Sequence, residues 1–304
     1  MVAFEAAYLE LWRSGALAQR AQAARAALSA CALCGHACGV NRLRGEQGRC
    51  RTGAVARVHG AAPHFGEERP LVGTGGSGTI FFSRCNLACQ FCQNYELSHL
   101  DAGEDCHPSR LARLMLGLQA AGCHNLNLVS PTHVLPMILD ALVLAAGAGL
   151  RLPIVYNTGG YDSQEALRLL AGVVDIYLPD MKFADAEVAH RLCGARHYPQ
   201  TNQAAVRLMH QQVGDLAVDA DGLARRGLLV RHLILPAGLG GTAAVAQFLA
   251  DEVSAETWIN VMDQYRPPLG VHLEGPLRRR VLPEEAAAAV AAVRAAGLRH
   301  VLGA

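Results

Sequence analysis

The stretch TIFFSRCNLACQFCQNYELSH, residues 79–99, joins a short apolar run to three closely spaced cysteines. The run TIFFS (79–83) contains the β-branched and aromatic residues that are typical of a buried strand. Cys85, Cys89 and Cys92 follow it with the spacing C-x3-C-x2-C. A closed structural zinc site or an ordinary iron–sulfur cluster takes four protein ligands, so three thiolates leave one metal position open. The stretch therefore predicts a strand with a catalytic metal centre at its carboxyl end.

Short apolar runs alternate with helical patterns from this stretch to the end of the chain. Such alternation indicates βαβ units and a parallel sheet. Six units are too few for the eightfold barrel, so the sequence predicts an α/β fold with a partial, open parallel (β/α)6 barrel. The predicted strands are 79–83, 125–129, 153–157, 175–179, 228–235 and 257–262, and the predicted helices between them are 109–121, 134–148, 163–171, 184–193, 202–213 and 242–252.

The chain divides into three predicted regions. Residues 1–30 form an N-terminal helical segment that is rich in alanine and interrupted near Ser14. Residues 31–72 form a cysteine-rich segment that is irregular and predicted to bind metal. Residues 73–304 form the partial barrel, which ends with a helix at 284–296. The helical and cysteine-rich regions together form an N-terminal extension of the barrel.

Composition excludes several classes of partner. The formal net charge of the 304 residues is +1, so the chain has no broad basic field for nucleic acid or an anionic membrane. The N-terminus lacks the basic start and apolar run of a signal peptide, and the apolar stretch 134–150 contains Asp140 and is too short to span a membrane. We expect a cytoplasmic protein, in which the ten cysteines are ligands or core residues rather than disulfides. Three cysteines that are isolated in sequence are predicted to be buried or incidental thiols: Cys106, Cys123 and Cys193.

Lys182 is the sole lysine of the chain; every other cationic residue among its 27 lysines and arginines is an arginine. An ammonium is compact, whereas a guanidinium is planar and presents its donors in a fixed fork. A lone lysine against this background indicates a position where a compact cation is needed. The alternative is a surface lysine without a special role.

Residues 83–99, SRCNLACQFCQNYELSH, are similar to the cluster loop of the pyruvate formate-lyase activating enzyme-related proteins, whose typical form is S-G-C-N-L-x-C-x-F-C-Q-N. Arg84 stands where that form has glycine. By this resemblance the chain is identified as a member of the radical S-adenosylmethionine (SAM) superfamily, in its branch of uncharacterised iron–sulfur homologues. The resemblance implies a [4Fe–4S] cluster on Cys85, Cys89 and Cys92, with SAM bound at the open iron. The alternative for these cysteines is a zinc knuckle or simple packing.

The resemblance also covers the segments NLNLVSPTH, PIVYNTGGY, VVDIYLPDMKF, LLVRHLILP and NVMDQYRP. Asp180 and Lys182 lie two apart at the end of a predicted strand, so an extended backbone points both to one side. They match the D-x-K motif of the activating enzymes, which implies contact with the methionyl end of SAM. Arg231 resembles the arginine of the family's fifth strand, which would neutralise the carboxylate of SAM.

The second and third strands end in further candidates for binding SAM. Many radical SAM enzymes carry a Gly-Gly-Glu motif where this chain has VSPTH, so Ser130 and Thr132 would offer hydroxyls in place of the carboxylate. Asn157 is a candidate for contact with the ribose, and the alternative is a turn residue before two glycines. Gln264 and Tyr265, at the end of the sixth strand, are candidates for contact with substrate, with ordinary packing as the alternative for Tyr265.

A second cysteine set precedes the predicted barrel. Cys31, Cys34, Cys38 and Cys50 have the spacing C-x2-C-x3-C-x11-C. Four thiolates so close together in a reducing compartment favour a metal over packing or redox use. A zinc ribbon usually has two C-x2-C pairs and this set has one, so a second iron–sulfur cluster and a zinc ion both stay open.

The sequence predicts a radical SAM oxidoreductase that cleaves SAM reductively and removes a hydrogen atom from its substrate. The resemblance to the activating enzymes suggests a backbone glycine of a polypeptide, and a peptide or small molecule is the alternative. It also implies an external electron donor such as flavodoxin or ferredoxin. A different class is a non-catalytic iron–sulfur or zinc protein for electron transfer or binding, which would not need the D-x-K pair.

Overall fold

The computed structural model describes residues 4–303, so the first three residues of the predicted N-terminal segment and Ala304 lie outside the described residues. The strands are β1 (Ala56–His64), β2 (Ser77–Phe82), β3 (Glu104–Cys106), β4 (Leu126–Val129), β5 (Ile154–Thr158), β6 (Ile176–Pro179), β7 (Ala217–Val218), β8 (Ala224–Leu233), β9 (Trp258–Met262) and β10 (His300–Leu302). The helices are α1 (Tyr8–Arg13), α2 (Ala16–Ala26), α3 (Arg69–Val72), α4 (Tyr95–His99), α5 (Pro108–Ala120), α6 (Leu135–Gly147), α7 (Gln164–Leu170), α8 (Ala186–Cys193), α9 (Tyr198–Val213), α10 (Thr242–Glu252) and α11 (Pro283–Ala295).

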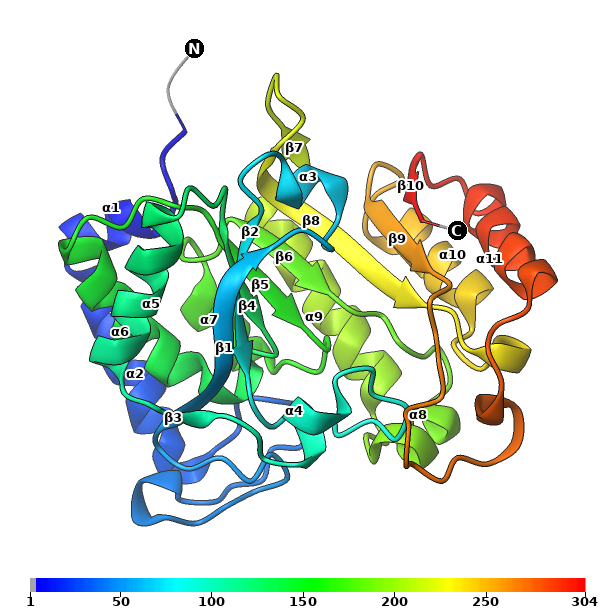
Figure 1. The fold of residues 1–304 in the computed structure, drawn as a ribbon, viewed down its shortest axis with the longest axis horizontal. Coiled ribbons are helices and arrows are strands. Elements are labelled where there is room, and N and C mark those ends of the chain that lie inside the picture. The colour runs from blue at the N-terminus through cyan, green and yellow to red at the C-terminus, as the bar shows by residue number, and fades with distance from the viewer. Residues whose placement is uncertain (1–3, 304) are drawn as a thin grey trace.

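The strands form one sheet in the order β10-β9-β8-β6-β5-β4-β2-β1-β3, with β7 paired to β8 (Figure 1). The path from β2 to β10 is parallel, whereas β1 pairs antiparallel with β2 and with β3. The prediction of an α/β fold with a mostly parallel, open sheet is confirmed. The sheet has one more parallel strand, β10, than the six strands that the sequence predicts.

Strand β1 lies inside the predicted cysteine-rich segment 31–72 and joins it to the main sheet. Its sequence, ARVHGAAPH, contains a glycine and a proline, which are depleted in strands. Pairing with β2 from Val58 to His64 supplies the backbone hydrogen bonds that local propensity does not suggest. The second half of the segment is therefore part of the sheet rather than a separate unit.

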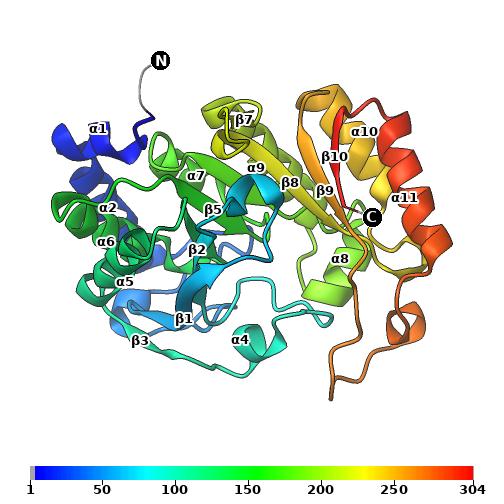
Figure 2. The ribbon, with the colours of Figure 1, turned by 45° about the horizontal axis from the view of Figure 1, so that its top comes forward.

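The helices cover the outer face of the sheet (Figures 1 and 2). Helices α2, α5 and α6 gather on one side and α10 and α11 on the other in both views. Strands β5 and β6 are buried along their whole length, as expected for parallel strands that are covered on both faces. The predicted break between the first two helices is at Gly15, whose φ is +77°. Among residues 4–303, no helix has the length and apolar character needed to cross a membrane.

The open side of the sheet lies between β1 and β9, and the segment that carries α3 crosses it (Figure 1). Glu68, at the start of α3, is buried and accepts hydrogen bonds from Arg231 of β8 and Asn260 of β9. This segment therefore closes part of the barrel interior and leaves the carboxyl ends of the parallel strands as the place for a site.

Candidate functional site

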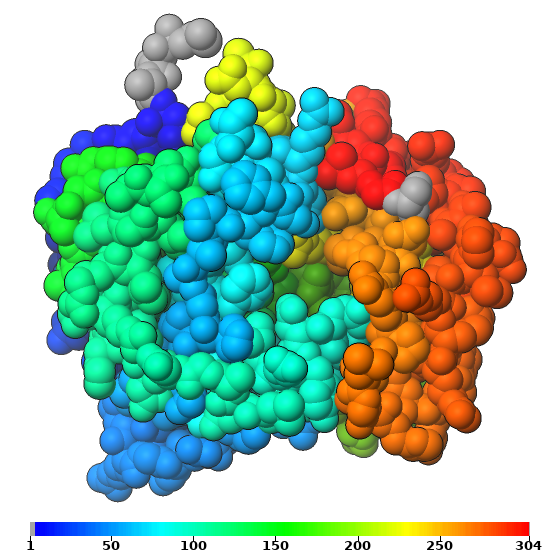
Figure 3. Space-filling view, in the orientation of Figure 1, coloured from blue at the N-terminus to red at the C-terminus, as the bar shows by residue number. Residues whose placement is uncertain are grey.

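A cavity of about 320 Å³ lies at the carboxyl ends of the parallel strands. In Figure 3 the molecule is hollowed between the cyan segments on one side and the orange segment after β9 on the other. The loop from β2 to α4 contributes three cysteines, and β4, β5, β6 and β8 contribute residues at or just beyond their ends. The predicted site residues that line the cavity are Cys85, Cys89, Cys92, Ser130, Asn157, Asp180, Lys182 and Arg231.

The cluster loop, residues 83–94, is fixed against α8. The Gln90 amide donates to the Leu192 carbonyl (2.9 Å), and the sulfurs of Cys89 and Cys193 lie 2.8 Å apart. Burial raises the pKa of the Cys85 thiol to about 12, and burial also raises the pKa of the Cys92 thiol. Neutral thiols of this kind release their protons when they bind a metal.

The donor set fits an iron–sulfur cluster with one open position. All three thiols line the same cavity, and soft thiolate ligands select clusters of this kind. Leu87 and Phe91, which alternate with these cysteines along the loop, are buried and give that side of the cavity an apolar lining. Within residues 4–303, no three His, Cys, Asp or Glu side chains are grouped closely enough to coordinate a single ion.

Arg84 begins the cluster loop in the left-handed region, with a φ of +69°. This is the position where the resembling loops have glycine, which adopts such angles without strain. The Arg84 guanidinium forms two hydrogen bonds with Asp101, at 2.5 and 2.9 Å. The ion pair holds a backbone conformation that the side chain itself disfavours.

We expect Arg84→Gly to be more stable than Arg84→Ala by about 1 kcal/mol, because both variants lose the ion pair with Asp101 and only alanine keeps the strained Cβ. Urea unfolding of the metal-free proteins measures the difference in the free energy of unfolding. Equal free energies of unfolding for the two variants would contradict a strained backbone at residue 84. The difference between the unsubstituted protein and Arg84→Gly then measures how far the ion pair with Asp101 compensates for the strain.

Asp180 and Lys182 follow β6 and point to the same cavity, as the D-x-K spacing predicts. The Lys182 ammonium is paired with the Asp180 carboxylate, and the two side chains are 18% and 22% exposed. Burial by itself lowers the pKa of Lys182, but Asp180 and the neighbouring Cys89 outweigh it and raise the pKa well above its usual value. The Tyr198 hydroxyl accepts a hydrogen bond from the Lys182 amide (3.0 Å) and fixes the backbone here.

The remaining polar lining comes from the ends of β4, β5 and β9. Ser130 turns out of β4 with a φ of +58°, and its amide donates to the carbonyl of Asn157 (2.9 Å). Gln264 lines the cavity beyond β9. Tyr265 is buried against Phe91, and its hydroxyl donates to a backbone carbonyl, so it is a packing residue.

Thr132, which the sequence predicts to contact SAM, is not among the residues that line the cavity. Its hydroxyl is buried and donates to the Asp162 carboxylate (2.7 Å). Tyr156 and Thr158 donate to the same carboxylate at 3.0 and 2.6 Å. This buried network stabilises the turn after β5. Of the two hydroxyl residues in the VSPTH segment, Ser130 is the one that lines the cavity.

Arg231 lines the cavity, where the sequence predicts that it neutralises the carboxylate of SAM. In the structure its guanidinium pairs with two carboxylates of the protein itself. Its guanidinium forms two hydrogen bonds of 2.6 Å with Glu68 and is also paired with Glu67. Burial alone would raise the pKa of Glu68, yet Arg231 holds that pKa below its usual value. Two carboxylates pair with this arginine, so it holds the α3 segment in place, and its contact with the carboxylate of SAM stays a prediction.

Sequence reasoning missed two contributions to the site. Cys193 touches Cys89, although its isolated position in the sequence gives no sign of this. His64 and Glu67 line the cavity from the end of β1 and the following loop, with Nδ1 and Oε1 3.3 Å apart. Both contributions come from segments that tertiary structure alone brings to the cluster loop.

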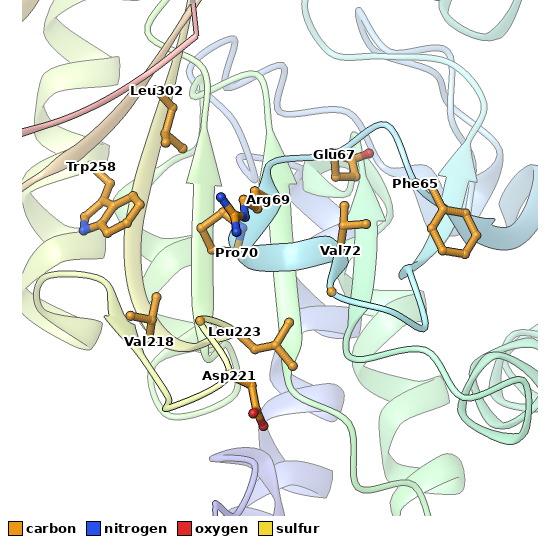
Figure 4. A pocket seen from close by; sticks show the side chains of 12 residues that line it. Phe65, Glu67, Arg69, Pro70, Val72, Val218, Asp221, Leu223, Trp258 and Leu302 are labelled. Carbon is orange, nitrogen blue, oxygen red and sulfur yellow. The ribbon is translucent and has the colours of Figure 1, made fainter.

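A larger cavity, about 760 Å³, lies near the opposite ends of β8 and β9 (Figure 4). Figure 4 shows Arg69 and Pro70 of α3 between Trp258 and Leu302 on one side and Val72 on the other. Barrel enzymes place their chemistry at the carboxyl ends of strands, and this cavity lies at the amino ends. Its size therefore does not make it the better candidate for catalysis.

The four cysteines of the N-terminal set also come together. Cys31, Cys34, Cys38 and Cys50 line one small cavity, about 20 Å³, beside the cluster loop. Each of the two cysteine sets therefore lines a cavity of its own.

The chain is 31% identical over 287 residues to "Uncharacterized protein MJ0674" of Methanocaldococcus jannaschii, a match that covers 91% of this chain and 78% of that protein. The chain belongs to the family of that protein. No protein-family model matches the sequence.

Two solved structures share the fold. A radical SAM methyltransferase from Sphaerobacter thermophilus has a TM-score of 0.51 and 14% sequence identity, over 74% of this chain and 65% of its own. Streptococcus suis SuiB, bound to the precursor peptide SuiA, has a TM-score of 0.50 and 10% identity, over 73% of this chain and 46% of its own. The chain therefore spans less than two thirds of either neighbour, and the likeness shows a fold found in a radical SAM enzyme.

Proposed function

We propose that this protein is a radical SAM enzyme whose centre is the cavity at the carboxyl ends of the parallel strands. The observation that carries this proposal is that three cysteines of one loop and the Asp180–Lys182 pair line the same cavity. A thiolate set with an open metal position and a half-buried cation three residues beyond a strand end are what a cluster and the methionyl carboxylate of SAM require.

When bound, a reduced [4Fe–4S] cluster supplies the electron that splits SAM into methionine and a 5′-deoxyadenosyl radical, which removes a hydrogen atom from substrate. The chain's own residues bind and shield. Cys85, Cys89 and Cys92 hold the cluster, and Lys182 orients the methionyl end through its ammonium. Asn157, which lines the same cavity, would contact the ribose.

Within this class we propose the branch related to the pyruvate formate-lyase activating enzymes, with a polypeptide as substrate. The motif of residues 83–99 supports the branch. The hollow in Figure 3 supports a polypeptide, because an extended segment can enter an open side that a closed barrel lacks. SuiB, which has the same fold, was crystallised with a precursor peptide.

The test is reductive cleavage of SAM by anaerobically reconstituted protein, measured as methionine and 5′-deoxyadenosine. A catalytic centre produces both, whereas an electron carrier or a binding protein produces neither. Deuterated cell protein and deuterated metabolites are added in separate reactions. Deuterium in 5′-deoxyadenosine from the protein fraction supports a polypeptide substrate, and deuterium from the metabolites alone rules against it.

A further inference from the structure

The N-terminal cysteine set surrounds one cavity and provides donors to its own sulfurs. Cys31 is buried, Cys34 and Cys50 are half-buried, and Cys38 is exposed. The Arg49 amide donates to the Cys38 sulfur (3.5 Å), and a Cβ at Gly48 would lie 2.8 Å from that sulfur. The chain therefore folds closely around the Cys38 thiol, with one backbone donor directed at its sulfur.

Arg42 supplies a positive charge to the same place. Its side chain is among the most deeply buried of the described residues, with the residue 2% exposed. Its guanidinium donates to the Cys31 sulfur (3.6 Å) and to the carbonyls of Gly53 and His133, at 2.7 and 2.8 Å. Arginine stays charged in proteins, and a buried cation needs an anionic neighbour. A metal centre with four thiolate ligands carries that negative charge, whereas neutral thiols do not.

The cysteine set is joined to the cluster loop by direct contacts. The His36 ring donates to the backbone carbonyl of Asn86 (2.9 Å). The Asn86 side chain accepts from the Cys85 sulfur at 3.7 Å. Asn86 thus contacts both Cys85 of the barrel set and His36, which lies between Cys34 and Cys38 of the N-terminal set.

A second contact runs through Arg42. The His133 carbonyl accepts from Arg42, and the His133 ring donates to the carbonyl of Ser83 (2.9 Å), which begins the cluster loop. The two connections put the N-terminal set directly beside the cluster loop, where a redox partner of the barrel cluster would have to lie.

We propose that Cys31, Cys34, Cys38 and Cys50 hold a second iron–sulfur cluster, which passes one electron to the cluster on Cys85, Cys89 and Cys92. The N-terminal cluster takes one electron from a low-potential external donor and becomes oxidised again when the cluster of the barrel is reduced by one electron. This electron transfer between the two clusters, called the relay below, rests on the proposed function, whereas the presence of the second cluster does not.

The test begins with the variant in which Cys85, Cys89 and Cys92 are all alanine. After anaerobic incubation with iron, sulfide and an equal amount of zinc, we expect about four irons and four sulfides per chain. Reduction should give the electron paramagnetic resonance signal of a single reduced cluster. Adding Cys34→Ala and Cys38→Ala should remove this iron. Zinc instead of iron, or neither metal at one site per chain, overturns the proposal whether or not the unchanged protein cleaves SAM.

A milder variant keeps the proposal testable if the multiple replacements fail to fold. Arg42→Met in the same triple-alanine background removes a buried positive charge beside Cys31, so the reduction potential of the cluster should become more negative. Arg44→Met, in the same turn but exposed, is the matched control and should leave the potential unchanged. Identical potentials for the two variants would overturn the placement of the cluster beside Arg42.

The relay has its own readout. In the unsubstituted protein with both clusters reduced, the resonance spectrum should differ from the sum of the two separate spectra, because neighbouring paramagnets couple. A simple sum would overturn the relay.

Discussion

Replacing Cys85, Cys89 and Cys92 together by alanine is expected to reduce cleavage of SAM to the level of a reaction without protein. Without these thiolates the cavity cannot hold a cluster, and the remaining lining has no redox group that could replace it. Iron content, the absorbance of the reconstituted protein and the yield of 5′-deoxyadenosine are measured on the same samples. We expect this variant to lose all activity, which is a larger effect than that of replacing any other residue that lines the cavity.

Two isolated cysteines provide the matched control for this variant. Cys106 and Cys123 are buried thiols that do not line the cavity. Alanine at both positions should leave the yield of 5′-deoxyadenosine close to that of the unchanged protein. Circular dichroism shows whether each variant keeps its fold. Cleavage at the unchanged rate by the triple variant would end the proposal that this loop carries the catalytic cluster.

The parts of the site that the sequence predicts are those whose geometry is local. Cys85, Cys89 and Cys92 lie within eight positions on one loop, so their spacing alone brings them together. Asp180 and Lys182 need only the alternation of an extended chain to share a side. The carboxyl ends of parallel strands then place this pair and the loop at one edge of the sheet.

Two other predicted site residues have partners from distant segments that the sequence does not reveal. Thr132 donates to Asp162, thirty positions away, and Arg231 pairs with Glu68 across 163 positions. A hydroxyl or a guanidinium at a strand end looks the same in sequence whether it faces a ligand or a buried carboxylate. Only the packing of the turn after β5, and of the segment around α3, decides between these partners.

Strand β1 and Cys193 are two further cases in which contacts with distant segments, rather than local sequence, determine the structure. The pairing of β1 with β2 overrides a sequence in which glycine and proline argue against a strand. Cys193 ends α8 and reaches Cys89 only because the loop docks on that helix end. No local pattern in the sequence encodes either contact.

Lys182→Arg is expected to weaken the binding of SAM by about tenfold or more, although the charge is retained. The ammonium is confined between Asp180 and the cavity that it shares with the three cysteines, and the side chain is 18% exposed. Asp180 stays paired in either variant, so the fold should survive. A guanidinium that pairs with Asp180 directs its remaining donors within its own plane, whereas an ammonium can donate to Asp180 and to a carboxylate of SAM from one point.

Equilibrium binding of SAM to the reconstituted proteins measures this effect, with iron content fixed as a check that the cluster is unchanged. Lys182→Met removes the charge and leaves the Asp180 carboxylate without its partner, so it should bind still more weakly and lose stability. We expect the affinity for SAM to fall from lysine to arginine to methionine at position 182. The difference between lysine and arginine measures the need for a compact cation, and the difference between arginine and methionine measures the need for a positive charge. Equal affinities for lysine and arginine would mean that any cation serves here, and the sole lysine of the chain would then need no explanation from the site.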